Sequence, residues 1–184
     1  MVIRCEWATE EPNLSYHDKE WGRPEHDDKK LFEFLILEGA QAGLSWVTIL
    51  KRRSGYLKAF SNFDPKKVAK YNQKQIAKLL KDESIIRNRL KINSAVNNAK
   101  QFLKVQQEFG TFDNYIWSFV DNKPIKNKFK KISDLPASTL ISEKMSKDLK
   151  KRGFNFVGPT ICYALMQAIG MVNDHTSECF RYQK

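Results

Sequence analysis

Apolar residues recur every three to four positions along much of the chain, which is the spacing of one face of an α-helix. The stretch from Ile92 to Leu103 shows this spacing most clearly. Asp64 and Pro65 predict a helix start, because Asp caps helices well and Pro is tolerated in the first turn. We find no pair of segments with the period-two alternation of strands, so we predict an all-α fold. The predicted helices lie at about 64–71, 76–80, 92–103, 113–119 and 140–151.

The segment from Leu31 to Leu37 is apolar nearly all round, which predicts a helix buried on most sides. Glu38 follows directly, and a carboxylate there is costly unless something pairs with it. Flat rings around one carboxylate suit a planar, electron-poor base, which stacks on the rings and donates its N–H groups to the carboxylate. The alternative, a helix-end Glu bonded to backbone amides beside an aromatic core, is the more common arrangement. The candidate aromatic residues are Trp7, Tyr16, Trp21 and Trp46.

Composition and charge narrow the function classes. The chain has 184 residues, with 32 Lys and Arg against 21 Asp and Glu, for a net charge of +11. Such an excess favours a polyanionic partner, nucleic acid first and an anionic membrane second, although a solubilising surface explains it equally well. No apolar run approaches the ~20 residues that span a bilayer. Three cysteines and no recognisable secretory signal predict a reducing compartment, the cytoplasm.

A helical hairpin is predicted before and within the apolar run that begins at Ile161. Gly158 gives the turn its backbone freedom, and Pro159 suits the first turn of the second helix. The unpaired N–H groups of that helix start could bind a phosphate, with Lys151 and Arg152 nearby. The alternative is an ordinary hairpin in the core, and the positive charge of the chain favours the phosphate site.

Four potential metal ligands are divided between the two ends of the chain, with Cys5 and His17 at one end and His175 and Cys179 at the other. Two Cys and two His make a complete structural zinc set, which leaves no open position for catalysis. The alternative is that the four residues are unrelated. This alternative stays open because the sequence lacks the short Cys-x-x-Cys spacing of zinc ribbons. Cys162 lies within an apolar helix and is predicted to be a core thiol.

Several motifs together resemble one known family, DNA-3-methyladenine glycosylase I. They occur in the family's order and cover nearly the whole chain. They are Arg4-Cys5-x-Trp7, Tyr16-His17-Asp18-x-Glu20-Trp21-Gly22, Leu37-Glu38-Gly39-x-Gln41-Ala42-Gly43-Leu44-Ser45-Trp46, Lys151-Arg152-Gly153-Phe154-x-Phe156-Val157-Gly158 and Asn173-Asp174-His175-x-x-x-Cys179.

The resemblance implies a helix-hairpin-helix DNA glycosylase fold in a single domain, 1–184. A small zinc-stapled lobe from about 1–25 and 170–184 would join the termini, and the hairpin would span about 144–168. The implied metal ligands are Cys5, His17, His175 and Cys179, holding one structural zinc ion. The implied catalytic residues are Glu38 and Tyr16, and the base-binding residues are Trp46, Trp7 and Trp21. The implied DNA-binding residues are Gly43, Leu44, Phe156, Val157, Gly158, Thr160, Lys151 and Arg152.

The implied activity is release of 3-methyladenine from alkylated double-stranded DNA, by flipping the nucleotide out and hydrolysing its N-glycosidic bond. We expect no strand cleavage, because no lysine stands out as a Schiff-base nucleophile. We also expect a monomer that does not bind membranes. One departure from the family is the segment 12–15, which lacks an aromatic that family members often carry. Asp174 lies near the position of the superfamily's catalytic Asp, and we assign it no chemical role.

Three other functions remain possible at this point. A non-catalytic binder of damaged DNA would share the fold and the charge. A zinc hydrolase or deaminase would need an open metal position beside a Glu, and the deaminase signature is missing from the sequence. A protein of anionic membranes would carry its basic residues on one amphipathic helix, whereas here they are spread along the chain.

Overall fold

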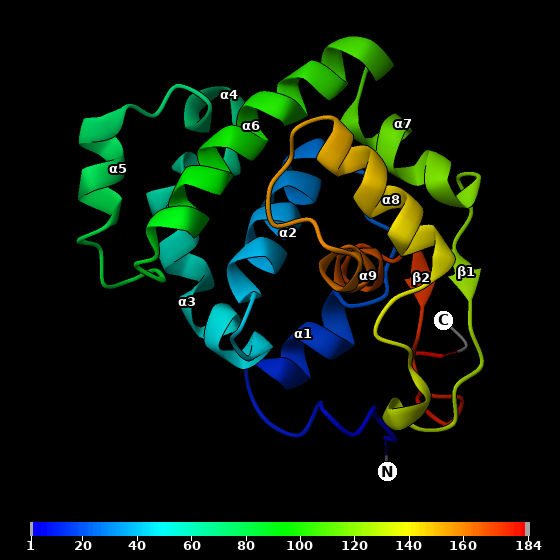
Figure 1. Ribbon diagram of the computed structural model, residues 1–184. Coiled ribbons are helices and arrows are strands. Elements are labelled where there is room, and N and C mark those ends of the chain that lie inside the picture. The colour runs from blue at the N-terminus through cyan, green and yellow to red at the C-terminus, as the bar shows by residue number, and fades with distance from the viewer. Residues whose placement is uncertain (1, 183–184) are drawn as a thin grey trace.

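The computed structural model describes residues 2–182 and is mostly helical (Figure 1). The α-helices are α1 Asn13–Lys19, α2 Asp28–Gln41, α3 Trp46–Ala59, α4 Pro65–Val68, α5 Gln73–Leu79, α6 Arg89–Phe109, α7 Phe112–Trp117, α8 Leu140–Lys151 and α9 Pro159–Ala168. Short 3-10 helices occur at η1 Ser61–Phe63, η2 Ser118–Val120 and η3 Ile132–Asp134. The strands are β1 Ile125–Lys126 and β2 Val172–Asn173.

Helix α2 is the centre of the core, as its apolar sequence predicts. Every residue from Leu31 to Ala40 is buried, because α3, α6, α7 and α9 pack around it. The Asp27 side chain begins the helix by accepting a hydrogen bond from the Lys30 backbone N–H. A helix enclosed on all sides is a rigid support for the side chains at its C-terminal end.

The predicted helices all form, and the main correction concerns strands. Residues 64–71 give the shorter helix α4, whereas α6 extends the predicted 92–103 segment at both ends. The unpredicted pair β1 and β2 is parallel, with Ile125 opposite Val172 and Lys126 opposite Asn173. Strands of two residues have no detectable period, so the sequence pattern could not reveal them. The pair attaches the lysine-rich segment 121–136 to the C-terminal segment.

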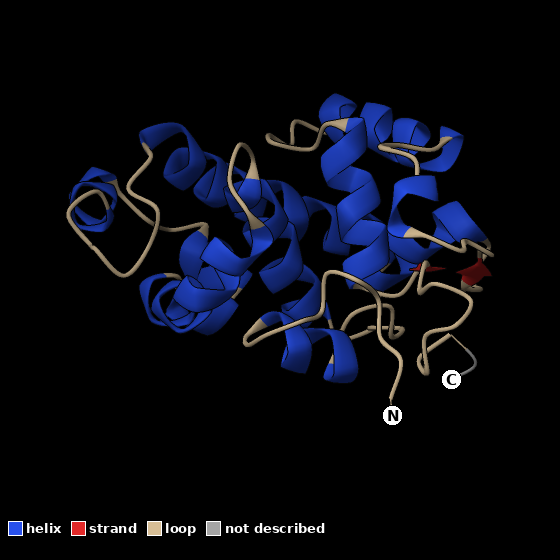
Figure 2. Cartoon of the chain, turned by 90° about the horizontal axis from the view of Figure 1, so that it is seen from below, coloured by secondary structure: helices blue, strands red, loops and turns tan. Residues whose placement is uncertain are grey.

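The first and last described segments of the chain lie near each other in both views (Figure 1 and Figure 2). The backbone N–H of Phe180 donates to the Ile3 carbonyl at 2.9 Å, and that of Ser177 donates to the Phe129 carbonyl at 2.8 Å. Within residues 2–182, no helix has the length and apolar character needed to cross a membrane.

Helices α8 and α9 pack against each other and are joined by residues 152–158. Gly158 caps α9 and Pro159 is its first residue, as predicted. The Ser146 hydroxyl donates to the Val157 carbonyl at 2.6 Å, which fixes the connection against α8. Phe156 has a φ of 54°, a left-handed conformation that is uncommon for an aromatic residue.

Candidate active site

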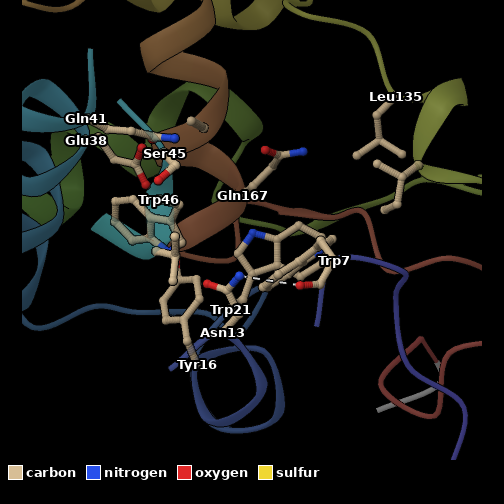
Figure 3. A pocket seen from close by; sticks show the side chains of 13 residues that line it. Trp7, Asn13, Tyr16, Trp21, Glu38, Gln41, Ser45, Trp46, Leu135 and Gln167 are labelled. Carbon is tan, nitrogen blue, oxygen red and sulfur yellow. Dashed lines mark hydrogen bonds between the residues drawn. The ribbon is translucent and has the colours of Figure 1, made fainter. Parts of the chain in front are cut away.

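A cavity of about 410 Å³ opens between α1, the end of α2, the start of α3, α9 and the segment around η3 (Figure 3). It brings together all five residues that the sequence suggested for a base pocket. The lining residues are Trp7, Asn13, Tyr16, Trp21, Glu38, Gln41, Ser45, Trp46, Val47, Ile132, Leu135, Ala164 and Gln167.

Glu38 is the chemically unusual group in this cavity. Its side chain is 4% exposed, and the buried Oε2 has no hydrogen-bond partner among the described residues. In the alternative arrangement, backbone amides would donate to the Glu38 carboxyl. No described amide donates to Oε2, so this atom does not fit that alternative. Burial raises the pKa of Glu38 to about 8, because desolvation disfavours the charged form. The cavity thus holds a carboxyl oxygen that no group within residues 2–182 hydrogen-bonds, and a bound cation would stabilise the charged form of Glu38.

The pKa of Glu38 predicts a pH-dependent stability. Between the usual carboxyl pKa and about 8, the folded chain holds this proton more tightly than the unfolded chain does. The free energy of unfolding therefore falls as pH rises through this window. Denaturant unfolding of wild type and Glu38→Gln should show the variant gaining relative stability, on the order of 4 kcal/mol once pH passes 8. A difference that stays constant from pH 5 to pH 9 would contradict the assignment.

Aromatic rings form the walls of the cavity. The ring centroids of Tyr16 and Trp46 are 5.4 Å apart, and those of Trp7 and Trp21 are 5.1 Å apart. Burial, and then the charge of Glu38, raises the pKa of Tyr16 well above its ordinary value, so its hydroxyl keeps its proton at neutral pH. A flat, apolar enclosure of this kind suits a planar ligand that carries charge toward Glu38.

The segment 12–15, which departs from the family pattern, contributes one residue to the wall of the cavity. Asn13 lines it there, and its Nδ2 donates to the Trp7 carbonyl at 3.4 Å. Its Oδ1 is buried with no partner among the described residues. A polar amide therefore lines this part of the entrance.

Sequence reasoning missed several lining residues. Gln41 and Ser45 could have been found because they lie between Glu38 and Trp46 in the sequence. Ile132 and Leu135 come from the lysine-rich segment, whose local pattern gives no sign of a pocket. Gln167 is a polar residue in an otherwise apolar helix, which is a signal that could have been used.

The turn between α2 and α3 lies at the edge of the cavity and carries Gly43 and Leu44. Gly43 has a φ of 76°, and the Leu44 side chain is 39% exposed. The Lys91 ammonium donates to the carbonyls of Ala40 and Ala42 at 2.8 and 2.6 Å. This lysine, which the sequence did not reveal, fixes the end of α2 and so the start of the turn.

The α8–α9 connection lies next to the helix that carries Glu38. A Cβ atom built on Gly39 would lie 3.4 Å from the Cβ of Phe156. The two cations predicted to bind phosphate differ in their surroundings. Lys151 is exposed, whereas the Arg152 guanidinium binds Asp148 and Glu108, both at 2.7 Å. Arg152 is therefore already engaged within the protein. Thr160 is exposed, Phe156 and Gly158 are half-buried, and Val157 is buried.

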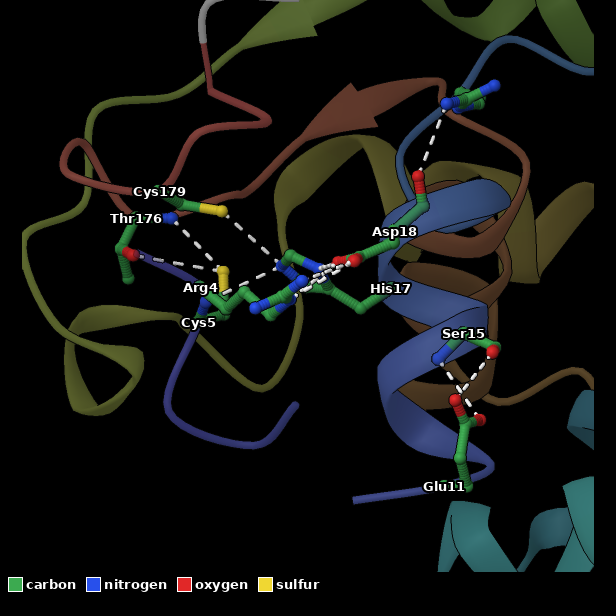
Figure 4. Close-up of polar contacts among 9 residues, drawn as sticks. Arg4, Cys5, Glu11, Ser15, His17, Asp18, Thr176 and Cys179 are labelled. Atoms are coloured by element: carbon green, nitrogen blue, oxygen red, sulfur yellow. Dashed lines mark hydrogen bonds and ion pairs between the residues drawn. The ribbon is translucent and has the colours of Figure 1, made fainter. Parts of the chain in front are cut away.

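A second cluster joins the ends of the chain (Figure 4). Potential ligand atoms of Cys5, His17 and Cys179 lie within 4.8 Å of one another, all buried, so these residues could hold a metal ion. His17 Nδ1 contacts Asp18 Oδ1 at 2.8 Å, while Nε2 lies 3.4 Å from the Cys179 sulfur and accepts the Cys5 backbone N–H at 3.4 Å. Such a carboxylate–histidine contact is typical of metal-ligating histidines. Burial raises the pKa of the Cys5 thiol to about 11.

His175 lies beside this cluster, with its ring centroid 5.0 Å from that of His17. Its Nδ1 contacts Asn173 Oδ1 at 2.9 Å, while Nε2 is buried with no partner among the described residues. Burial lowers the pKa of His175 to about 3, so the ring stays neutral and Nε2 can act as a metal ligand. Cys162 is buried elsewhere in the core, as predicted, and donates to the Val157 carbonyl.

The chain is similar to known proteins over nearly its whole length. The family model described as methyladenine glycosylase matches residues 7–182. The chain is 48% identical over 180 residues to DNA-3-methyladenine glycosylase 1 of Escherichia coli (strain K12), covering 97% of this chain and 96% of that protein. It is also 48% identical over 180 residues to DNA-3-methyladenine glycosylase of Haemophilus influenzae, covering 97% of each.

A solved structure of 3-methyladenine DNA glycosylase I from Staphylococcus aureus, which describes the basis of 3-methyladenine recognition, has a TM-score of 0.95. The two chains are 38% identical, and the match covers 98% of this chain and 97% of that one. Fold and site therefore define a DNA glycosylase, an enzyme that hydrolyses a base from DNA. Within that class, the chain belongs to the methyladenine glycosylase family, which confirms the resemblance seen in the sequence.

Proposed function

We propose that this enzyme releases 3-methyladenine from alkylated double-stranded DNA by hydrolysis, leaving an abasic site and an uncut strand. The observation that carries the proposal is the buried Glu38 Oε2, which has no hydrogen-bond partner in the part of the chain that the structure describes and lies in a cavity walled by aromatic rings. The names of the curated relatives support the substrate.

The chemistry of the base explains what the cavity has to do. Methylation at N3 makes the adenine in DNA cationic, so it leaves as a neutral base and needs little acid catalysis. The cationic base would draw Glu38 into its ionised form, accepting hydrogen bonds from the base. At pH 7 this ionisation costs only about 1.4 kcal/mol for a pKa near 8. An unmethylated, neutral adenine offers no charge to offset that cost.

Stacking and enclosure complete the proposed site. Trp46 and Tyr16 would stack on the extruded base, with Trp7 and Trp21 closing the other side. Extrusion costs a few kcal/mol of lost stacking, which these contacts would offset. The DNA phosphates would stabilise the positive charge that develops on the sugar as the bond breaks.

DNA contacts are proposed on the face that surrounds the cavity. Gly43 and Leu44 would enter the gap left by the extruded nucleotide, supported by the Lys91 contacts with the end of α2. The connection of Phe156, Val157 and Gly158, with Thr160 and Lys151, would bind the strand backbone as a helix-hairpin-helix motif. Arg152 would contribute mainly by fixing α8, because its guanidinium is bound by Asp148 and Glu108.

We also propose that Cys5, His17, His175 and Cys179 hold one zinc ion, which joins the segments 1–25 and 170–184 into a lobe of a single domain. His175 supports the fourth position, because its buried Nε2 has no hydrogen-bond partner among residues 2–182. Two thiolates and two neutral imidazoles fill a tetrahedral zinc site, so the ion would supply structure and no catalysis. We propose a monomer that acts in the cytoplasm.

The test is to incubate purified protein with duplex DNA treated with a methylating agent and to identify the free bases. We expect 3-methyladenine in solution and DNA that breaks only after alkaline treatment. Binding of methylated duplex without release of base would replace the enzyme assignment with a damage-binding role. Strand cleavage by the protein itself would overturn the monofunctional mechanism.

A further inference from the structure

We infer that Gln167 selects purines with a 6-amino group and that Asp174 is the positioning residue that fixes its amide. The inference rests on the proposed function and deepens it. Gln167 lies in the last turn of α9 and lines the cavity that holds Glu38. Its side chain points into that cavity, with the amide oxygen on the side of Glu38 and Ser45 (Figure 3).

The orientation of the amide follows from its partner. Gln167 Nε2 donates to Asp174 Oδ2 at 2.8 Å. A carboxylate oxygen only accepts hydrogen bonds, so the amide must turn its NH₂ group to Asp174. The reversed amide would set two acceptor oxygens against each other. The carbonyl oxygen Oε1 is therefore the end that faces the cavity, as a fixed acceptor.

Asp174 is itself held firmly. Its side chain is 0% exposed and also accepts hydrogen bonds from Asn127 Nδ2 at 2.7 Å and from the Tyr163 hydroxyl. Both carboxylate oxygens are thus occupied by donors from outside its own segment. Burying a carboxylate costs free energy, which these donors offset. Because Asp174 cannot turn away, it keeps Gln167 in one orientation.

A fixed acceptor in the cavity that also holds Glu38 gives this cavity a preference among methylated bases. The 6-amino group of 3-methyladenine has two N–H donors, enough for one acceptor from each residue. 3-Methylguanine carries the same methyl group and charge but has an oxygen at position 6, which would face these acceptors without a partner. A site whose polar groups hydrogen-bond the substrate discriminates strongly against an analogue that leaves those groups without a partner.

Asp174→Asn tests the positioning role. An Asn amide can donate or accept, so Gln167 could turn over and present its NH₂ group to a 6-oxo base. We expect the release rate of 3-methylguanine relative to 3-methyladenine to rise about 10-fold, the equivalent of one hydrogen bond. Gln167→Leu, which removes the acceptor and keeps the bulk, should lower 3-methyladenine release about 10-fold and also weaken the discrimination.

Tyr163→Phe is the matched control. It removes one hydrogen bond to Asp174, but Asn127 still holds Asp174 Oδ1 and the contact between Asp174 and Gln167 stays intact. We expect it to lower the melting temperature while the ratio of released bases stays at the wild-type value. Bound metal is measured in every sample, because Asp174 precedes His175 in the sequence.

Three outcomes overturn the inference: an unchanged base ratio in folded, metal-loaded Asp174→Asn, an unchanged ratio in Gln167→Leu, or an equal change in Tyr163→Phe. An equal change in Tyr163→Phe would mean that the base ratio responds to a loosened cavity and not to the orientation of the Gln167 amide. Failure of the wild type to release 3-methyladenine would instead defeat the proposed function.

Discussion

Glu38→Gln should lower kcat/KM for release of 3-methyladenine from DNA by about 10²–10⁴-fold, because removing one partner of a buried charge pair costs about 3–5 kcal/mol. Glutamine keeps the shape of the side chain and one acceptor oxygen, but it cannot carry the negative charge. The positive charge of the substrate passes from the base toward the sugar as the bond breaks, so it is present throughout the reaction. Loss of the carboxylate therefore raises the free energy of the transition state relative to free enzyme and DNA. Single-turnover release of labelled base measures this effect.

Glu33→Gln is the matched control for this substitution. Glu33 lies on the same helix and is equally buried at 4% exposure, but it is paired with Arg53 at 2.7 Å and Lys30 at 2.8 Å. Its loss should reduce stability, since it breaks a buried ion pair, and should leave kcat/KM near the wild-type value. Equal activity losses in both variants would mean that Glu38 acts only through the fold.

The sequence predicted best where a single physical effect dominates. The apolar run Leu31–Leu37 predicted a helix buried on most sides, and the structure places it at the centre of the core. That placement puts Glu38 in a cavity with apolar walls. A charged carboxylate there loses its hydration, so it needs a partner or a ligand to offset the cost. The aromatic residues were harder to place, because rings in a core and rings around a ligand have the same composition. Only the cavity distinguishes the two.

Features that depend on contacts between distant segments could not be predicted. Arg152 has one partner within its own helix, Asp148, but its second partner, Glu108, lies 44 positions away in the sequence. Leu135 reaches the cavity because β1 and β2 hold the lysine-rich segment in place. The contact between Gln167 and Asp174 joins a helix to a strand end, and neither residue alone signals it.

Cys179→Ser should lower bound metal and thermal stability together. A serine hydroxyl is a poor zinc ligand, so the remaining three residues would hold the ion weakly. Because metal bound only by the folded state adds directly to folding free energy, we expect a loss of about 3–5 kcal/mol. For a chain of this size that corresponds to a fall in melting temperature of roughly 6–20 °C. Elemental analysis and thermal unfolding of the same preparation measure both effects.

Cys162→Ser separates the metal effect from the cost of burying a hydroxyl. Cys162 is as buried as Cys179, but its sulfur donates to the Val157 carbonyl and is not part of the Cys5, His17 and Cys179 cluster. A serine there can keep that hydrogen bond, so its metal content should remain at one ion per chain with a smaller fall in melting temperature. Normal metal content in Cys179→Ser would remove Cys179 from the ligand set. If wild-type protein binds no zinc, the zinc site is wrong, and only hydrogen bonds and packing hold the two terminal segments together.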